Sequence, residues 1–133
     1  MQEHKLTFSM ENYLEAVYEL SRGESGARVT DIAQRMDVTK ASANNAMSVL
    51  SDKGLIINEK YQEIYLTPEG LKHARAVSQK HTIIESYFIN VLDITPETAN
   101  TDACAIEHVI SHESVYAMLQ HLSKLGFKHE FDV

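Results

Sequence analysis

Three side chains with metal-binding chemistry lie close together in the last third of the chain. They are Cys104, Glu107 and His108, so the second and third follow the cysteine by three and four positions. Side chains at this spacing share one face of an α-helix. A thiol, a carboxylate and an imidazole on one face provide half of a coordination shell for a first-row transition metal. The spacing therefore predicts a metal site, although a single cysteine on a helix is more often a small buried apolar residue.

The bulk composition is that of an ordinary globular chain. Of its 133 residues, 44% are hydrophobic and 23% are charged, as in soluble domains. No apolar run approaches the roughly 20 residues that cross a bilayer, and the N-terminus lacks the apolar core of a signal peptide. A single cysteine cannot form a disulfide within the chain. We therefore expect a cytoplasmic protein with no membrane partner.

A helix-turn-helix pattern occupies the middle of the first half. Apolar residues at helical spacing predict a short helix over 29–36, capped by Thr30, and a longer helix over 40–53 that ends at Gly54. Residues 37–39 are too few for anything but a tight turn between them. Two helices of this size joined by such a turn are typical of a DNA-reading motif.

The elements on either side agree with that interpretation. A first helix is predicted over 9–22, with Ser9 as its N-cap and Gly23 at its end. Two β-rich runs within 55–66 flank a polar tip at 60–62, which predicts a β-hairpin. A hairpin directly behind a helix-turn-helix is the wing of a winged helix.

The second half of the chain is predicted to be helical. A long linking helix is expected over about 68–92, followed by a loop over 93–98 that contains Pro96. A helix over 99–111 carries the candidate ligands, and a last helix follows over 113–125. These two helices contain more apolar surface than they can bury alone, which predicts a homodimer interface.

Together these elements predict a mainly α protein with a small β-hairpin wing. We expect a winged helix-turn-helix DNA-binding domain over residues 1–70 and an all-α metal-binding and dimerisation domain over 71–133. The alternative is that residues 29–70 form a structural unit without a role in DNA binding. Pattern, order and spacing of the elements all favour the winged helix.

The predicted DNA-binding domain is acidic. The chain has a formal net charge of −7, and residues 1–70 contain eleven Asp and Glu against seven Lys and Arg. Bulk charge therefore argues against constitutive DNA binding, and we expect the metal-free protein to bind weakly. Cations and hydroxyl groups are predicted to contact phosphate, and asparagine amides to pair with adenine. The predicted phosphate contacts are Arg28, Thr39, Lys40, Ser42 and Lys60. The predicted base contacts are Asn44 and Asn45. Singly, each is nearly as often a plain surface residue.

With these elements placed, the chain resembles the metal-dependent repressors of the diphtheria-toxin-repressor and manganese-transport-regulator family. The resemblance covers nearly the whole chain in the same order of elements. The stretches that carry it are SMENYLEAVYEL (9–20), RVTDIAQRMDVTKASANNAMSVLSDKGLI (28–56), YLTPEG (65–70), KHTIIESYF (80–88) and DACAIEHVIS (102–111). It implies a non-enzymatic repressor of metal-homeostasis genes that acts as a homodimer on a palindromic double-stranded DNA operator.

The resemblance also implies metal ligands from three helices. Besides the three residues already named, the implied ligand positions are Asn12 and Glu15 on the first helix, His81 on the long helix, and Glu85, which matches a carboxylate of a neighbouring site. Asn12 departs from the family, which has Asp in manganese-type and Met in iron-type members. Cys104 matches the iron-type, where the manganese-type has Glu. Asn100 replaces a second-site His of iron-type members, so a complete second site of that kind is not expected.

The mixed ligand set determines the expected metal. Carboxylates suit Mn²⁺, imidazoles suit Fe²⁺, and a thiolate shifts the preference toward softer ions. We therefore expect Fe²⁺ to be favoured narrowly over Mn²⁺. Zn²⁺, Co²⁺ and Ni²⁺ are expected to bind in vitro, because affinity follows the Irving–Williams order. The length of the chain leads us to expect the short architecture of manganese-type members, without a third, SH3-like domain.

Three other interpretations stay open at this point. The chain is a winged-helix regulator that responds to another ligand, a metalloenzyme that uses the same cluster, or an interaction module with a vestigial site. Against the enzyme, the sequence contains no Gly-rich anion loop and no His-Glu-x-x-His motif. A metal titration, a turnover assay, and a DNA-binding screen with and without metal distinguish the three.

Overall fold

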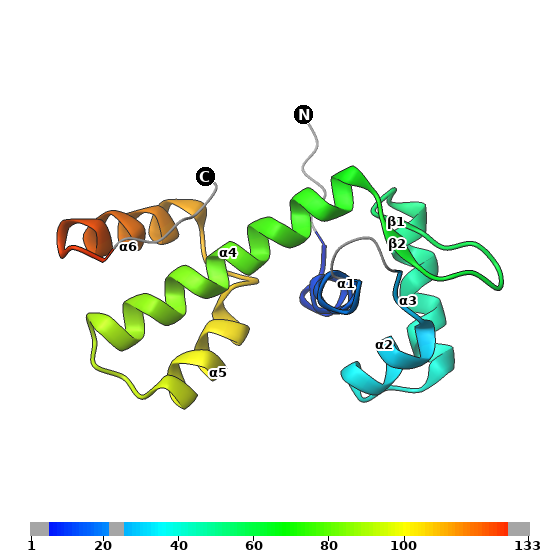
Figure 1. Ribbon diagram of the computed structural model, residues 1–133, viewed down its shortest axis with the longest axis horizontal. Helices are drawn as coiled ribbons and strands as arrows, with labels where there is room; N and C mark the ends of the chain where they lie inside the picture. The colour runs from blue at the N-terminus through cyan, green and yellow to red at the C-terminus, as the bar shows by residue number, and fades with distance from the viewer. Residues whose placement is uncertain (1–5, 22–25, 128–133) are drawn as a thin grey trace. The chain divides into compact units, whose positions relative to one another are not determined.

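The computed structural model describes residues 6–21 and 26–127. Within these ranges the chain forms six α-helices and one two-stranded sheet, which confirms the mainly α fold with a small hairpin (Figure 1). The chain divides into two compact units, the first ending at Arg75 and the second beginning at Ala76. Among the described residues, no helix is both long and apolar enough to cross a membrane.

Helix α1 spans Phe8–Leu20 and begins earlier than predicted. Its N-cap is Thr7, whose extended backbone leaves the side chain free to accept a hydrogen bond from the backbone N–H of Met10 at 3.1 Å. The prediction of Ser9 as the cap was wrong, since that residue already lies inside the helix. The predicted end at Gly23 falls outside the described residues.

Helices α2 (Val29–Met36) and α3 (Lys40–Asp52) form the helix-turn-helix. Thr30 does not cap α2, because the N-cap position belongs to Arg28, which makes no side-chain capping bond. The turn between the helices contains no glycine. Asp37 adopts the left-handed conformation there, with φ of 56°, which short polar residues tolerate better than most others.

The wing pairs β1 (Ile56–Ile57) with β2 (Tyr65–Leu66) in antiparallel register, as predicted. An isolated bridge between Ala27 and Ile64 adds the segment before α2 to its edge. The tip between the strands contains Tyr61 at a φ of 65°.

One hydrophobic core holds the first unit together. Side chains from α1, α2, α3 and the segment after α3 meet in it and are almost completely shielded from solvent. The largest of them are Leu14, Ile32, Met47, Leu50 and Leu55. Because α1 shares this core with both helices of the helix-turn-helix, a displacement of α1 is transmitted to α2 and α3 by direct packing.

Helix α4 spans Pro68–Asn90, so it begins in the first unit and ends in the second. Thr67 caps it by accepting a hydrogen bond from the Gly70 N–H at 3.0 Å. A Cβ atom at Gly70 would lie 1.9 Å from the carbonyl oxygen of Leu55. Only glycine therefore allows the start of α4 to approach the segment before β1 this closely.

The second unit adds α5 (Pro96–Ile106) and α6 (His112–Lys124). The prediction of a loop through residue 98 was wrong, because Pro96 is the first residue of α5, where proline needs no N–H partner. The prediction that this helix continues to residue 111 was also wrong. It ends at Ile106, so Glu107 is its C-cap and His108 lies in the following turn.

The hydrophobic cluster of the second unit is small. Its buried members among the described residues are Ile83 from α4 with Val115 and Leu122 from α6. Several large apolar side chains of this unit remain exposed instead. They are Leu92, Val109, Tyr116 and Leu125.

Candidate metal centre

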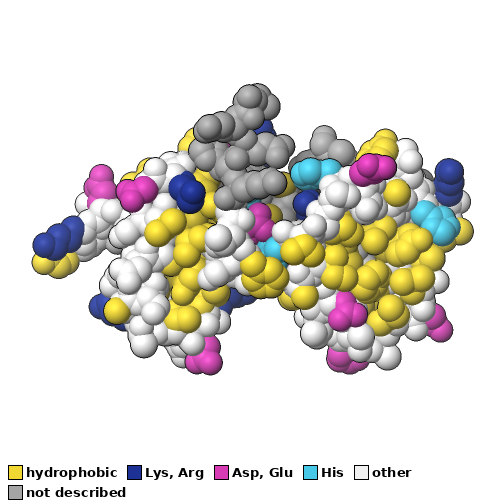
Figure 2. Space-filling view, turned by 180° about the vertical axis from the view of Figure 1, so that it is seen from behind, with side chains coloured by type: hydrophobic (Ala, Val, Ile, Leu, Met, Phe, Trp, Pro, Cys, Tyr) yellow, Lys and Arg dark blue, Asp and Glu magenta, His cyan; other side chains and the backbone are white. Residues whose placement is uncertain are grey.

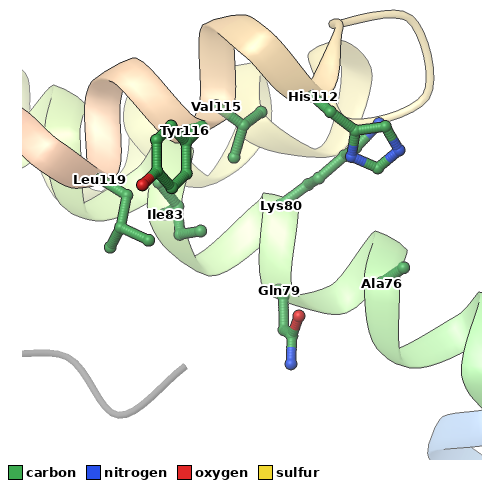
Figure 3. Close-up of a pocket in the computed structure, with 8 residues that line it drawn as sticks. All are labelled: Ala76, Gln79, Lys80, Ile83, His112, Val115, Tyr116 and Leu119. Atoms are coloured by element: carbon green, nitrogen blue, oxygen red, sulfur yellow. The ribbon is translucent and has the colours of Figure 1, made fainter. Parts of the chain in front are cut away.

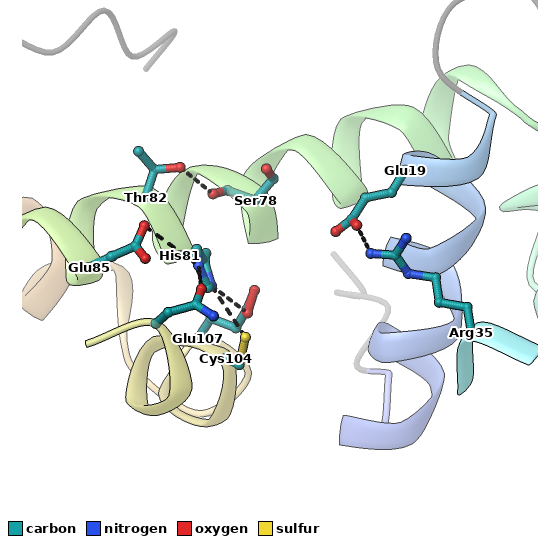
Figure 4. Close-up of polar contacts among 9 residues, drawn as sticks. Glu19, Arg35, Ser78, His81, Thr82, Glu85, Cys104 and Glu107 are labelled. Atoms are coloured by element: carbon teal, nitrogen blue, oxygen red, sulfur yellow. Dashed lines mark hydrogen bonds and ion pairs between the residues drawn. The ribbon is translucent and has the colours of Figure 1, made fainter. Parts of the chain in front are cut away.

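Three of the predicted ligands come together between α4 and the end of α5. The Nδ1 atom of His81 lies 3.1 Å from Oε1 of Glu107 and 3.8 Å from Sγ of Cys104 (Figure 4). One ligand atom from each residue lies within 4.8 Å of the other two. A nitrogen, an oxygen and a sulfur donor therefore converge on one small volume.

Local helix geometry places the two α5 ligands. Cys104 lies on α5, and Glu107 keeps a helical backbone as the C-cap, with its N–H donating to the Ala103 carbonyl oxygen at 3.0 Å. This bond continues the helix for one residue, so the spacing of three positions still directs both side chains to one side. The spacing argument therefore holds, although the helix is shorter than predicted.

Glu107 is the side chain that requires an explanation. It is 1% exposed, and one of its oxygens contacts His81. Its other oxygen, Oε2, is buried and has no hydrogen-bond partner among the residues that the structure describes. A buried polar atom without a partner costs about 1–3 kcal/mol, and more when it is charged. A cation beside Oε2 would remove this cost, so the donor set fits a divalent transition metal.

The electrostatics of the centre act on His81. The hydrogen bond from its ring to Glu107 raises the pKa of the imidazole above the ordinary value of 6.5, against the opposing effect of burial. The charges of Glu107 and Glu85 and a hydrogen bond to Asn100 raise this pKa further. Since a metal binds only the deprotonated nitrogen, protons and metal compete for this residue.

The opposite edge of the His81 ring faces two other residues. Its Nε2 lies 3.0 Å from Oδ1 of Asn100 and 3.9 Å from Oε1 of Glu85. The predicted ligand Glu85 therefore adjoins the ring nitrogen that points away from Cys104. The sequence analysis treated Asn100 only as a replaced ligand. Its position four residues before Cys104, on the same face of α5, is the signal that could have revealed this contact.

The remaining predicted ligands are His108, which adjoins Glu107, and two residues of the first unit. A ring nitrogen of His108 lies within 4.8 Å of a carboxylate oxygen of Glu107. Asn12 and Glu15 belong to α1 of the first unit, where they lie three positions apart and are half-buried. Their participation in metal binding stays a prediction.

A cation next to the centre was not foreseen from the sequence. The ammonium group of Lys80 donates a hydrogen bond to the carbonyl oxygen of Ile110 at 3.1 Å. That carbonyl lies in the turn that follows α5 and contains His108. Lys80 therefore fastens this turn to α4, one position before His81. The only sequence signal was its place beside a predicted ligand.

All seven predicted DNA contacts are exposed. Lys40 begins α3, and Asn44 and Asn45 lie on its solvent-exposed side. The hydroxyls of Thr39 and Ser42 lie 3.0 Å apart and are engaged with each other at the start of α3. Lys60 is at the wing tip, where its ammonium lies 5.3 Å from the centroid of the Tyr61 ring.

Comparison with known proteins matches the two halves of the chain to two family descriptions. Residues 5–64 match the "Iron dependent repressor, N-terminal DNA binding domain". Residues 67–130 match the "Iron dependent repressor, metal binding and dimerisation domain". The boundary between the matches lies immediately before α4.

Individual relatives agree with the family descriptions. The HTH-type transcriptional regulator MntR of Lysinibacillus sphaericus is 33% identical over 109 residues, which cover 82% of this chain and 78% of that protein. The transcriptional regulator MntR of Escherichia coli O6:H1 is 32% identical over 119 residues, covering 90% of this chain and 76% of that protein.

A solved relative gives the same result in three dimensions. The structure of ScaR with bound Zn²⁺ is 31% identical, with a TM-score of 0.75, over 86% of this chain and 53% of that protein. This chain therefore spans about half the length of that relative. The family matches, the identities and the shared fold confirm the resemblance, and the chain belongs to the iron-dependent-repressor family of metal-dependent transcriptional regulators, which includes the MntR proteins.

Proposed function

We propose that this chain regulates transcription by binding double-stranded DNA when a divalent metal is bound at the centre around Glu107. The observation that carries the proposal is the buried Oε2 of Glu107, beside His81 and Cys104, which has no hydrogen-bond partner in the described part of the chain. An apolar side chain there would avoid the cost of burying a carboxylate. The presence of a carboxylate, an imidazole and a thiol at this point is what a regulatory metal site needs.

The proposed ligands come from both halves of the chain. His81, Cys104, Glu107 and His108 supply nitrogen, sulfur and oxygen donors from the second unit. Asn12 and Glu15 are proposed to add oxygen donors from α1, as the family resemblance implies. When bound, the metal supplies positive charge that offsets the carboxylates and joins ligands from separate helices. Glu85 lies on the opposite side of the His81 ring, and we propose it for a neighbouring site, as the family resemblance implies.

The packing of α1 supplies the proposed route from metal to DNA. Leu14 and Val17 of α1 are buried in the same core as Ile32 of α2 and Met47 of α3. If α1 donates ligands, the metal-bound state favours one placement of the helix-turn-helix. The metal then shifts the population toward the DNA-binding arrangement by its higher affinity for that state.

The proposed DNA-binding surface is the exposed side of α3 with the wing. Asn44 and Asn45 on α3 are assigned to base edges, and Lys40, Lys60 and Arg28 to phosphates, with Thr39 and Ser42 at the start of α3. The acidic composition of this half of the chain makes metal-free binding weak. The relatives named as transcriptional regulators support a regulatory role, and we propose no catalytic activity.

The second unit is proposed to form a homodimer. Hydrophobic side chains gather on one face of it (Figure 2), and Val109 is 76% exposed. A groove of about 180 Å³ between α4 and α6 is lined by Ile83, Val115, Tyr116 and Leu119 (Figure 3). A second copy that covers this face would bury it and present two α3 helices to a palindromic operator.

The choice of metal is the finer part of the proposal. Relatives carry the name MntR, and ScaR is described as a manganese-activated repressor. These names favour Mn²⁺. The thiol of Cys104 favours a softer ion, and on this ground we propose a narrow preference for Fe²⁺, with Zn²⁺, Co²⁺ and Ni²⁺ binding in vitro. Cys104→Glu exchanges the soft donor for a hard one and should shift activation toward Mn²⁺.

The test is an anaerobic DNA-binding measurement across a panel of divalent metals. The probe is a duplex selected by the metal-loaded protein from a random pool, with a scrambled duplex as the control. We expect affinity for the selected duplex to rise at least about fivefold with Mn²⁺ or Fe²⁺ over the chelated protein. Equal affinity with and without every metal of the panel would overturn the proposal. Equal responses of the wild type and Cys104→Glu to Mn²⁺ and Fe²⁺ would remove only the preference for iron.

A further inference from the structure

The two nitrogens of the His81 ring face different surroundings. Nδ1 points toward Sγ of Cys104 at 3.8 Å and Oε1 of Glu107 at 3.1 Å (Figure 4). Nε2 lies 3.0 Å from the amide oxygen of Asn100 and 3.9 Å from Glu85. The ring therefore separates a side with a thiol and a buried carboxylate from a side with an amide and a partly exposed carboxylate.

A neutral imidazole carries one N–H group and one lone pair. A metal binds the nitrogen with the lone pair, so the other nitrogen must carry the hydrogen and donate it. The amide oxygen of Asn100 is a pure acceptor within hydrogen-bond distance of Nε2, whereas Glu85 at 3.9 Å is beyond it. Nδ1 also faces an acceptor, Oε1 of Glu107 at 3.1 Å, so the metal-free ring can donate at both nitrogens. When a metal takes the place of the hydrogen on Nδ1, the hydrogen bond to Asn100 stabilises the tautomer with hydrogen on Nε2.

We propose that Asn100 is a positioning residue that directs the metal to Nδ1 of His81, on the side of Cys104 and Glu107. This inference rests on the proposed metal-binding function and names a role for the residue that replaces a ligand of iron-type family members. Here the asparagine does not bind the metal. It holds the imidazole in the orientation and tautomer that coordination through Nδ1 needs.

The competing arrangement places the metal at Nε2, with Asn100 and Glu85 as ligands and the Nδ1–H donated to Glu107. It leaves the thiol of Cys104 outside the shell. It also leaves Oε2 of Glu107 buried without a partner, at the cost that such an atom carries. Coordination through Nδ1 uses both of these donors, and the structure favours it for that reason.

The experiment reads the tautomer directly. Long-range ¹H–¹⁵N spectra of Zn²⁺-loaded protein labelled at histidine show which ring nitrogen carries hydrogen and which binds the metal. For His81 we expect hydrogen on Nε2 and the metal on Nδ1. A spectrum with the metal on Nε2 would overturn the inference and leave the regulatory function standing. Failure of the wild type to bind Zn²⁺, Mn²⁺ or Fe²⁺ at all would overturn both.

Two substitutions at Asn100 distinguish the effect of its acceptor oxygen from the effect of its side-chain size. Asn100→Leu has a similar size without an acceptor, and Asn100→Asp keeps an acceptor oxygen. The residue is exposed on α5 and leucine is a good helix former, so both variants should fold. We expect Asn100→Leu to lower Zn²⁺ affinity about tenfold and to mix the two tautomers, because outer hydrogen-bond partners of a ligand contribute this much. Asn100→Asp should keep hydrogen on Nε2.

The matched control is Asn90→Leu, an exposed asparagine of the same unit whose amide bonds to Ser86 instead. It should bind Zn²⁺ as the wild type does. Wild-type affinity and a wild-type tautomer in Asn100→Leu would overturn the positioning role. DNA binding by Asn100→Leu is also measured at saturating Mn²⁺. Because a lower metal affinity is overcome at this concentration, the measurement tests the proposed regulatory function separately from the positioning role.

Discussion

The two units of this chain are stabilised by different means. The first encloses a core of large aliphatic side chains drawn from three helices and the segment before β1. Over residues 76–127, the second has a hydrophobic cluster with three buried members, and its most buried large polar group is the carboxylate of Glu107. The contrast indicates that hydrophobic burial stabilises the first unit, while the second unit gains part of its stability only when metal is bound.

The largest effect should come from removing core volume in the first unit. Leu50 of α3 is fully buried, so Leu50→Ala should lower the free energy of unfolding by about 2–5 kcal/mol. The loss should be similar with and without metal, because this core contains no candidate ligand. Denaturant unfolding measures it, with Leu92→Ala, at a position 52% exposed, as the control. If metal restored the stability that Leu50→Ala loses, the two units would not be stabilised separately.

The second unit should respond to metal much more than the first. At a free metal concentration of 100 times Kd, binding adds about 2.7 kcal/mol to the stability of the state that binds. Amide hydrogen exchange should show this gain in α5, with a smaller gain in α2 that arises through Asn12 and Glu15. In Glu107→Gln the gain in α5 should disappear. Equal gains in α2 and α5 would contradict the contrast between the units.

A weaker effect should appear in the metal-free protein as the pH changes. Because Glu107 raises the pKa of His81 in the folded state, protonated His81 stabilises the second unit fully at pH values below the ordinary pKa of 6.5. That contribution is lost as the pH rises through the raised pKa. The stability difference between the wild type and His81→Asn should therefore be largest below pH 6.5 and shrink above it. In a Glu107→Gln background this pH dependence should become smaller, because only Glu85 and Asn100 then raise the pKa of His81. A pH dependence of undiminished size in that background would point to another cause.

The smallest effect concerns the wing. Lys60→Ala should weaken binding to selected and random duplexes by a similar factor, since a phosphate contact carries no sequence information. The slope of log affinity against log salt should fall by about 1. Lys124→Ala at the end of α6 is the control and should change neither quantity. Loss of affinity on the selected duplex alone would assign Lys60 to base recognition instead.

Much of the first unit could be predicted because its signals are local. Helical periodicity placed α2 and α3, and two β-rich runs around a polar tip placed the wing. The cap of α1 was misplaced because Thr7 and Ser9 are both good N-caps, and only the backbone conformation decides between them. Pro96 was interpreted as part of a loop over 93–98, although proline also fits the first turn of a helix.

The candidate site was predictable only in part. The spacing of Cys104 and Glu107 survived the early end of α5, because the C-cap keeps helical geometry. The orientation of the His81 ring depends on residues 19 and 26 positions away along the chain. Such contacts arise from the packing of α4 against α5, which no local pattern specifies. The burial of Glu107 and the role of Asn100 therefore needed the structure.

The most direct test of the central claim is thermodynamic linkage between metal and DNA. If metal at the Glu107 centre raises DNA affinity by some factor, DNA must raise metal affinity by the same factor. Anaerobic Mn²⁺ titrations with and without the selected duplex should differ by at least about fivefold, a typical lower value for allosteric coupling. The factor should match the one from DNA titrations and should be absent in Glu107→Gln. Identical Mn²⁺ affinities in the two titrations of the wild type would contradict the account.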